Sequence, residues 1–379
     1  MTPILPGATL GMLGSGQLGR MFAIAARRLG YKVEVFSPDQ ETPAGQIADR
    51  EWVAAYQDEK ALLEFAQRVD VVSLEFENID VKALELLEQH VPVRPGPKTL
   101  HTSQHRSREK AALRGMGLPT APFRIVRCAD DLRTALGEFG EGILKTAAWG
   151  YDGKGQQRLR GHEDPAQVWT SFSTDEAVLE GVVAFDCEFS VIGVRGCGGE
   201  FTVYAPVVNT HANHILDLSV SPDSRLPVNI GAQAQAMTRT IMEQLETVGV
   251  LCVEFFLSTQ GQPIINEIAP RPHNSGHLTI DAHVTCQFEQ QVRAICGLPL
   301  GSTRQRQPAA MANLLGDVWP EHGEPDWASL LTLPDVKLHL YGKAEARRGR
   351  KMGHLTALAN TPEEAAALAI SARASCQRG

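Results

Sequence analysis

Apolar and polar positions near the start of the chain predict strands and helices in regular alternation. Short apolar runs predict the strands, and apolar residues that recur at helical spacing predict the helices. Strands are predicted at 8–13, 32–36 and 69–76, and helices at 17–29 and 80–89. Strands that alternate with helices are typical of a parallel, doubly wound α/β sheet. A proline-rich segment at 91–97 then predicts a domain boundary.

Beyond this boundary the pattern predicts longer, mixed α+β elements. Helices are predicted at 98–116, 129–139 and 230–248 and from residue 362 onward. Strands are predicted at 123–126, 142–146, 177–183, 187–194, 201–208, 309–315, 336–341 and 355–359. The composition shifts after Pro299, where a short polar segment is typical of a linker.

Two apolar runs flank the turn-like segment 259–262 and predict a β-hairpin. If Gln260 and Gly261 form a two-residue turn, Glu254 lies directly opposite Glu267. Like charges that face each other across two strands are unfavourable, so the pair predicts a shared proton or a divalent cation. The alternative is an exposed hairpin whose glutamates point to solvent.

The segment 269–277 after the hairpin is too rich in Pro and Gly to be helical, yet it concentrates polar chemistry. Arg271, His273 and His277 lie in it together with an amide and a hydroxyl. The two histidines have helical spacing, but H-E-x-x-H is absent, so a zinc site is not predicted. Anion recognition by Arg271 and the imidazoles is the favoured interpretation.

Composition and charge narrow the class of protein. The chain has 379 residues, too many for one ordinary core, so more than one domain is expected. The net charge of −8 argues against a general nucleic-acid binder. Seven scattered cysteines without a C-x-x-C pair fit reduced thiols. Neither a signal sequence nor a membrane-spanning run stands out, so we expect a cytoplasmic protein with no membrane partner.

A glycine-rich turn, Gly14-Ser15-Gly16-Gln17-Leu18-Gly19, lies between the first predicted strand and helix. It matches G-x-G-x-x-G, in which amides at a helix N-terminus approach a phosphate. Asp39 follows at the spacing of a ribose-binding acid. A nicotinamide cofactor, another phosphorylated ligand and tight helix–strand packing therefore stay open. The polar segment 75–78 would either meet a ligand at the sheet edge or cap the next helix.

Basic residues mark three further segments. Lys145 ends an apolar strand, and the segment 147–156 after it contains three glycines whose amides can close over phosphates. An unpaired lysine in an apolar strand is costly, which favours a phosphate site here. The charges of 98–116 are interpreted as a solvated basic face. The five basic residues within 343–351 are either solvated surface or a phosphate site.

These motifs occur in an order that resembles the ATP-grasp enzymes, in which two α+β lobes hold ATP between them. The chain further resembles the N5-carboxyaminoimidazole ribonucleotide synthetase family of purine biosynthesis in G-S-G-Q-L-G-R-M, Y-D-G-K-G-Q, N-E-I-A-P-R-P-H-N-S-G-H and G-R-K-M-G-H-L. The resemblance covers essentially the whole chain. It implies a Rossmann-like domain at 1–97, an ATP-grasp domain at 98–300 with a lid subdomain at about 119–184, and a small C-terminal domain at 301–379.

The resemblance implies an ATP-dependent carboxylating ligase. ATP and bicarbonate would carboxylate 5-aminoimidazole ribonucleotide through carboxyphosphate, with Mg²⁺ as cofactor and with release of ADP and phosphate. The family also suggests a homodimer. A formate-dependent glycinamide ribonucleotide transformylase is the alternative of the same fold. A nicotinamide-dependent dehydrogenase and a non-catalytic nucleotide sensor are alternatives from other classes.

The resemblance also implies roles for individual residues. ATP would contact Arg106, Lys145, Gly150, Tyr151, Asp152, Gly153, Lys154, Gly155, Gln156, Glu180, Gly181, Val182, Val183, Glu188, His211, Asn266 and Glu267. The ribonucleotide would contact Gln17, Leu18, Glu75, Asp152, Arg271, His273, Asn274, Lys343 and Arg350. Glu254 and Glu267 would bind Mg²⁺. Asp152, Arg271, Lys343 and Arg350 would act in catalysis.

The implied reaction accounts for these residue types. Bicarbonate is a poor electrophile, so its oxygen attacks the γ-phosphoryl group, a step that needs positioning and charge neutralisation. Carboxyphosphate hydrolyses readily, so the glycine-containing segment 147–156 must exclude water from the site. Asp152 is expected to accept the proton of the amine, with Glu75 as the alternative. The family commonly has an extra Gly and Arg where this chain has Ala147, Ala148 and Trp149.

Overall fold

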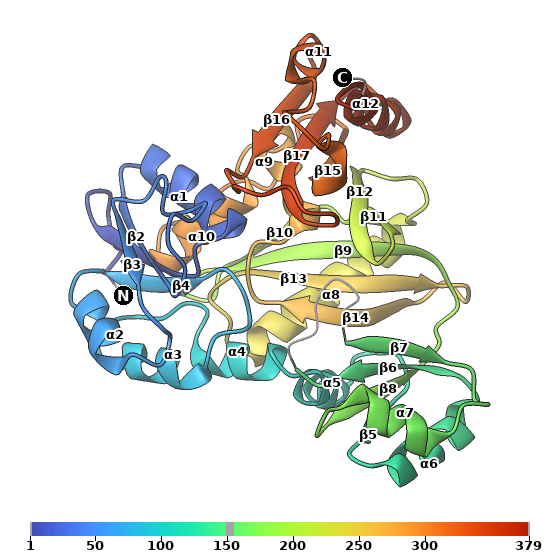
Figure 1. Ribbon diagram of the computed structural model, residues 1–379. Coiled ribbons are helices and arrows are strands. Elements are labelled where there is room, and N and C mark those ends of the chain that lie inside the picture. The colour runs from blue at the N-terminus through green and yellow to red at the C-terminus, as the bar shows by residue number, and fades with distance from the viewer. Residues whose placement is uncertain (1, 149–154, 378–379) are drawn as a thin grey trace.

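The computed structural model describes residues 2–148 and 155–377 (Figure 1). Its N-terminal part is a parallel sheet in the order β3-β2-β1-β4. The elements are β1 (Thr9–Leu13), α1 (Gln17–Arg28), β2 (Lys32–Ser37), β3 (Arg50–Val53), α2 (Glu59–Ala66), β4 (Val71–Leu74) and α3 (Val81–Glu88). The predicted α/β alternation is confirmed. The pattern misses β3 because only Trp52 of this strand is buried.

A long antiparallel sheet forms the centre of the molecule, in the order β14-β13-β9-β11-β12-β15-β17-β16, with β10 beside β9. Its strands are β9 (Phe185–Arg195), β10 (Phe201–Val203), β11 (Val207–Ala212), β12 (Ile215–Ser221), β13 (Gly249–Ser258), β14 (Pro263–Ala269), β15 (Ala309–Leu315), β16 (Val336–Leu340) and β17 (Lys351–Leu358). The strand predicted at 201–208 is two strands, β10 and β11, which pair at different places on β9. Because β12 pairs with β15, one sheet runs through the boundary predicted at 300.

A separate small antiparallel sheet has the order β5-β8-β6-β7. It consists of β5 (Phe123–Val126), β6 (Gly142–Thr146), β7 (Gln156–Leu159) and β8 (Ala177–Gly181), with α6 (Ala129–Phe139) and α7 (Pro165–Phe172). Both helices pack against this sheet through a shared apolar core that includes Leu132, Leu144 and Leu179. The sheet lies within the segment predicted as the lid subdomain, at the lower right of Figure 1.

The helix predicted at 98–116 is two helices, α4 (Pro97–Ser103) and α5 (Arg106–Gly115). His105 between them has an extended backbone, with φ −139° and ψ 112°. The Gln104 side chain donates to the carbonyl oxygens of Glu77 and Ile79. The break lets the N–H of Arg106 donate to the carbonyl oxygen of Ala147 at 2.7 Å, which ties α5 to the end of β6. The pattern misses this break because no Gly or Pro marks it.

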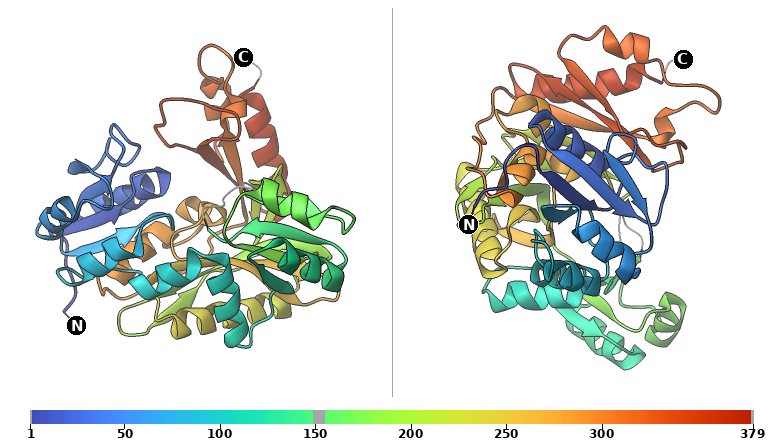
Figure 2. Two further views of the ribbon diagram at one scale, coloured as in Figure 1. Left: turned by 60° about the horizontal axis from the view of Figure 1, so that its bottom comes forward. Right: turned by 90° about the vertical axis from the view of Figure 1, so that its left-hand side faces the viewer.

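In Figure 1 the N-terminal sheet lies at the left of the central sheet and the small sheet at its lower right, while the C-terminal strands β15, β16 and β17 form the upper end of the central sheet itself (Figures 1 and 2). The remaining elements are α8 (Val228–Gln244), η1 (Asn274–Gly276), α9 (Thr279–Ala282), α10 (Gln287–Ile295), η2 (Gly316–Val318), α11 (Trp327–Leu331) and α12 (Pro362–Ser375). α10 joins the N-terminal domain to the central sheet, because Phe288 and Val292 share a core with Phe22 of α1. Within the described ranges, no helix is both long and apolar enough to cross a bilayer.

Candidate active site

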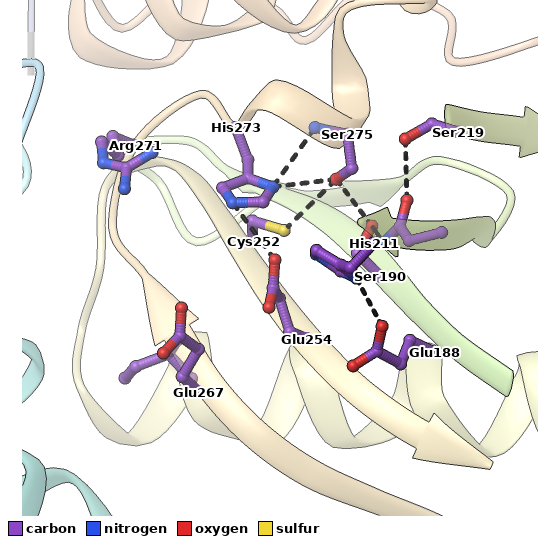
Figure 3. Close-up of polar contacts among 12 residues, drawn as sticks. Glu188, Ser190, His211, Ser219, Cys252, Glu254, Glu267, Arg271, His273 and Ser275 are labelled. Atoms are coloured by element: carbon purple, nitrogen blue, oxygen red, sulfur yellow. Dashed lines mark hydrogen bonds and ion pairs between the residues drawn. The ribbon is translucent and has the colours of Figure 1, made fainter. Parts of the chain in front are cut away.

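The hairpin of β13 and β14 places Glu254 directly opposite Glu267, as predicted (Figure 3). The predicted two-residue turn is wrong. Ser258 and Gln262 instead close a three-residue loop, in which Gly261 has a positive φ of 73°. This loop shifts the pairing by one residue, and a bulge next to Glu254 shifts it back. The two offsets cancel at the glutamates, whose side chains therefore share one face of the sheet.

The two facing glutamates have unequal pKa values. Burial and the charge of Glu267 raise the pKa of Glu254 to about 7. Burial acts in the same direction on Glu267, but the charges of Arg106 and Lys145 outweigh it and lower its pKa. Arg106 Nη1 lies 3.2 Å from Glu267, and His273 Nε2 lies 3.3 Å from Glu254. The pair is thus bordered by cations at one end and by an imidazole at the other.

A second cluster of buried charges supports the hairpin. Lys145 Nζ lies 2.9 Å from Glu180, and Lys110 Nζ lies 3.5 Å from it. Burial raises the pKa of Glu180, but the two lysines outweigh burial and hold this pKa at about 2. Lys110 is fully buried and donates to the backbone oxygen of Asn266 at 2.8 Å. The interpretation of the 98–116 charges as a solvated face is therefore wrong.

Glu109 and Lys110 are residues of this cluster that the sequence analysis missed. Glu109 accepts a hydrogen bond from the N–H of Ile268 at 2.6 Å, next to the hairpin carboxylates. Burial raises the pKa of Glu109 to about 8. A signal for Lys110 was available, because it precedes the buried Leu113 by one helical turn and shares its helix face.

The glycine-rich turn of the N-terminal sheet holds a carboxylate of the protein itself. The N–H groups of Gly16 and Gly19 both donate to Glu75, the second at 2.7 Å. A Cβ at Gly14 would lie 2.4 Å from Glu75 Cγ, so the turn requires glycine there. Because amides that would meet a phosphate are already bonded, the nicotinamide interpretation loses its support. α3 is capped by a residue outside 75–78, so the capping alternative is also wrong.

Two of the residues predicted for the ribonucleotide, Arg271 and Lys343, lie near Glu75. Arg271 Nε lies 2.9 Å from Glu77. Burial raises the pKa of Glu75, although its amide donors and the charges of Arg271 and Lys343 act against burial. Lys343 lies between β16 and β17 and donates to the carbonyl oxygen of Lys351 at 2.7 Å. The loop between these strands therefore reaches the N-terminal sheet.

Asn274 is the clearest candidate for direct ligand contact. It is 8% exposed, and within residues 2–148 and 155–377 neither of its amide atoms has a hydrogen-bond partner. A buried amide without partners is costly, which favours a ligand that supplies them. Gln17 and Leu18 begin α1 and are half-buried. Arg350 is also half-buried and donates to the carbonyl oxygen of Glu345 at 2.9 Å.

The two imidazoles of 269–277 have different environments. His273 faces Glu254, whereas His277 is fully buried, with its ring centroid 4.8 Å from that of His354. Burial lowers the pKa of both histidines well below the usual value, so both are neutral. Anion recognition by both imidazoles is therefore wrong for His277, which packs in the interior.

The remaining predicted ATP residues lie on or next to β7, β8, β9 and β11. Glu188 and His211 form a hydrogen bond that, against the effect of burial, raises the pKa of His211. Gly181 ends β8, Val182 and Val183 follow it, Gly155 has a φ of 71°, and Gln156 begins β7. The predicted residues Gly150, Tyr151, Asp152, Gly153 and Lys154 lie outside the described residues.

Family models match three successive parts of the chain. Residues 7–104 match the ribonucleotide synthetase preATP-grasp domain, and residues 111–288 match the ATP-grasp domain. Residues 309–368 match the phosphoribosylaminoimidazole carboxylase C-terminal domain. These matches confirm the predicted fold class.

The similarity to known proteins extends over nearly the whole chain. The N5-carboxyaminoimidazole ribonucleotide synthase of Bacillus subtilis is 41% identical, over 95% of this chain and 94% of its own. A solved N5-carboxyaminoimidazole ribonucleotide synthetase in its ADP complex is 44% identical, with a TM-score of 0.92 and 98% of each chain covered. The Aspergillus clavatus enzyme, solved with ADP and 5-aminoimidazole ribonucleotide, is 30% identical, with a TM-score of 0.88 over 98% of this chain and 99% of its own. This chain belongs to the N5-carboxyaminoimidazole ribonucleotide synthase family of ATP-grasp ligases.

Proposed function

We propose that the residues around the β13–β14 hairpin carry out the reaction of this family, the ATP-dependent carboxylation of 5-aminoimidazole ribonucleotide. The observation that carries the proposal is the facing pair Glu254 and Glu267, with Arg106 at one end and His273 at the other. This arrangement supplies two carboxylates for a cation and positive charge for phosphates at one place.

The facing carboxylates fit a bound Mg²⁺. Burial and repulsion raise the pKa of Glu254, and a cation between the two groups would relieve that repulsion. Mg²⁺ typically takes one or two carboxylates and completes its shell with substrate phosphates and water. The part of the chain that the structure describes contains no group of three His, Cys, Asp or Glu that could hold a metal. When bound, the ion would neutralise charge that develops on the phosphates.

In the first step, a bicarbonate oxygen attacks the γ-phosphoryl group and ADP leaves. Arg106 and Lys145 lie next to Glu267 and would hold the phosphates in line. The Glu180 carboxylate is occupied by Lys145 and Lys110, so the ATP contact predicted at this residue would come from its backbone. Glu188 would bind the ribose of ATP.

In the second step, the amine of the ribonucleotide attacks carboxyphosphate or the CO₂ that it releases. Arg271, His273 and Asn274 follow β14 directly, so they would bring the ribonucleotide to the phosphate end of the hairpin. Lys343 and Arg350 would bind the phosphate of the ribonucleotide. Asp152 remains the predicted proton acceptor, and normal turnover and normal ribonucleotide affinity in Asp152→Ala would remove that role.

The glycinamide ribonucleotide transformylase alternative is not favoured. The relatives that match nearly the whole chain are named for the carboxylating enzyme. Bicarbonate as co-substrate, a homodimer and a cytoplasmic location remain predictions.

Phosphate release from ATP, followed with each amine in turn, tests the proposal. We expect release that requires 5-aminoimidazole ribonucleotide and bicarbonate, together with a product heavier than the ribonucleotide by one carboxyl group. Release that instead requires glycinamide ribonucleotide and formate would establish the alternative. A calorimetric titration of the protein with analytical-grade MgCl₂ and ADP, repeated without the metal, separately tests the metal site.

A further inference from the structure

A row of buried polar side chains connects His273 with the middle of the central sheet (Figure 3). Ser219 Oγ donates to Asn209 Oδ1 at 2.8 Å, and Asn209 Nδ2 donates to Ser190 Oγ at 3.1 Å. Ser190 Oγ donates to Ser275 Oγ at 2.7 Å, and this last hydroxyl lies 2.9 Å from His273 Nδ1. We call Ser219, Asn209, Ser190 and Ser275 the polar relay.

Burying the polar side chains of the relay between apolar strand residues costs free energy unless they bond to one another. The three serines are fully buried and Asn209 is 5% exposed, while their strand neighbours Val191 and Val208 are apolar. Asn209 pairs directly with Ser219 across β11 and β12, so both side chains lie on one face of the sheet. Buried polar side chains that satisfy one another fix a unique arrangement of donors and acceptors, which apolar residues cannot do.

The direction of donation determines which nitrogen of His273 carries hydrogen. Because the Ser275 hydroxyl accepts from Ser190, its own hydrogen is available to His273 Nδ1. The backbone N–H of Ser275, which can only donate, also points to Nδ1, at 3.4 Å. A nitrogen that accepts a hydrogen bond carries no hydrogen, so the ring N–H lies on Nε2.

The other side of the ring agrees with this assignment. His273 Nε2 lies 3.3 Å from Glu254 Oε1, and a carboxylate oxygen accepts hydrogen bonds. We propose that the polar relay locks His273 in its Nε2–H tautomer, so that His273 acts at the Glu254 end of the site as a hydrogen-bond donor and not as a proton acceptor. This inference rests on the function proposed above. The four relay residues are positioning residues, since they act through His273.

The tautomer of His273 can be read directly in the full-length protein. Protein labelled with ¹⁵N-histidine is compared with the same sample of His273→Gln, which identifies the His273 signals by their loss. We expect Nδ1 at the chemical shift of an unprotonated nitrogen and Nε2 at that of a protonated one. A protonated Nδ1 in the wild type would overturn the proposal, and this measurement needs no relay variant to fold.

Relay variants then test whether the row of hydroxyls maintains the tautomer. Ser275→Ala removes the hydroxyl donor, and we expect mixed His273 tautomers and a kcat lower by roughly tenfold, the size of one hydrogen bond. Ser275→Thr keeps the hydroxyl and should restore both. Ser221→Ala is the matched control, because Ser221 is a fully buried serine of the same strand as Ser219 whose hydroxyl bonds Pro206 and Gln305 outside the relay.

The result separates this inference from the proposed function. If Ser275→Ala matches Ser221→Ala in both the spectrum and kcat, the polar relay does not act on His273. If the wild type shows the expected tautomer but releases no phosphate with 5-aminoimidazole ribonucleotide, the proposed function fails while the assignment of the tautomer stands.

Discussion

Glutamates of two kinds differ in what faces their carboxylates. Glu75 accepts from the amides of the glycine-rich turn, and Glu180 is held between Lys110 and Lys145. Glu254 instead faces the carboxylate of Glu267. A carboxylate that faces only amides or lysines of the chain stabilises the fold. A carboxylate that faces another carboxylate is available to a ligand, so burial alone does not identify an active site.

The largest expected effect is on stability, when Glu180 loses one of the two lysines that balance its charge. Lys110→Met leaves Glu180 with one lysine, and breaking a buried ion pair costs about 3–5 kcal/mol. We expect the free energy of unfolding in urea to fall by that amount. Lys98→Met, which removes the exposed partner of Glu246, is the control and should change it little. Equal losses in the two variants would mean that burial does not strengthen the Glu180 cluster.

A change in the facing pair should act on catalysis. Glu267→Gln keeps the shape of the side chain but removes one charge from the proposed cation site. Losing one preorganised charge-stabilising group typically lowers kcat by about 10²–10³-fold, which we expect for ribonucleotide-dependent phosphate release. Glu243→Gln on the exposed face of α8 is the control. Near-normal turnover of Glu267→Gln would remove the metal assignment.

Glu75→Gln should have a smaller effect, and mainly on stability. A glutamine has one acceptor oxygen, so it can satisfy only one of the two amides of Gly16 and Gly19 and leaves the other facing an NH₂ group. A buried donor without an acceptor costs about 1–3 kcal/mol. Thermal unfolding should show this loss, while Glu41→Gln, at an exposed position, should not. An unchanged midpoint would mean that the glycine-rich turn does not depend on Glu75.

The smallest expected effect is a pH dependence of the free energy of unfolding, measured in metal-free buffer. The folded-state pKa of Glu254 is about 7, above the ordinary 4.5, so the folded chain holds the proton more tightly than the unfolded chain. Its contribution to stability therefore falls as pH rises through this interval. Glu254→Gln lacks the titrating group, so its stability relative to wild type should rise by about 1 kcal/mol between about pH 6 and pH 7. A difference that stays constant with pH would contradict the raised pKa.

The sequence predicts the geometry correctly where residues close together in the chain decide it. The pairing of Glu254 with Glu267 follows from strand alternation and a short turn, and an error in the turn was cancelled by a bulge. The sequence does not predict the partner of Lys110, because Lys110 lies in α5 whereas Glu180 lies in β8 of the small sheet. The sequence also does not predict the break before Arg106, because the Gln104 side chain that stabilises it bonds to the segment between β4 and α3.

The sequence by itself determined the alternating parallel sheet, the hairpin with facing carboxylates and, through its motifs, the family. Tertiary structure alone decided that Glu75 occupies the glycine-rich turn, that two lysines share Glu180, and that the polar relay ends at His273. The physical reason is distance along the chain. Periodicity and turn length constrain residues that are close in sequence, whereas these contacts join segments that meet only when separate sheets and loops pack together.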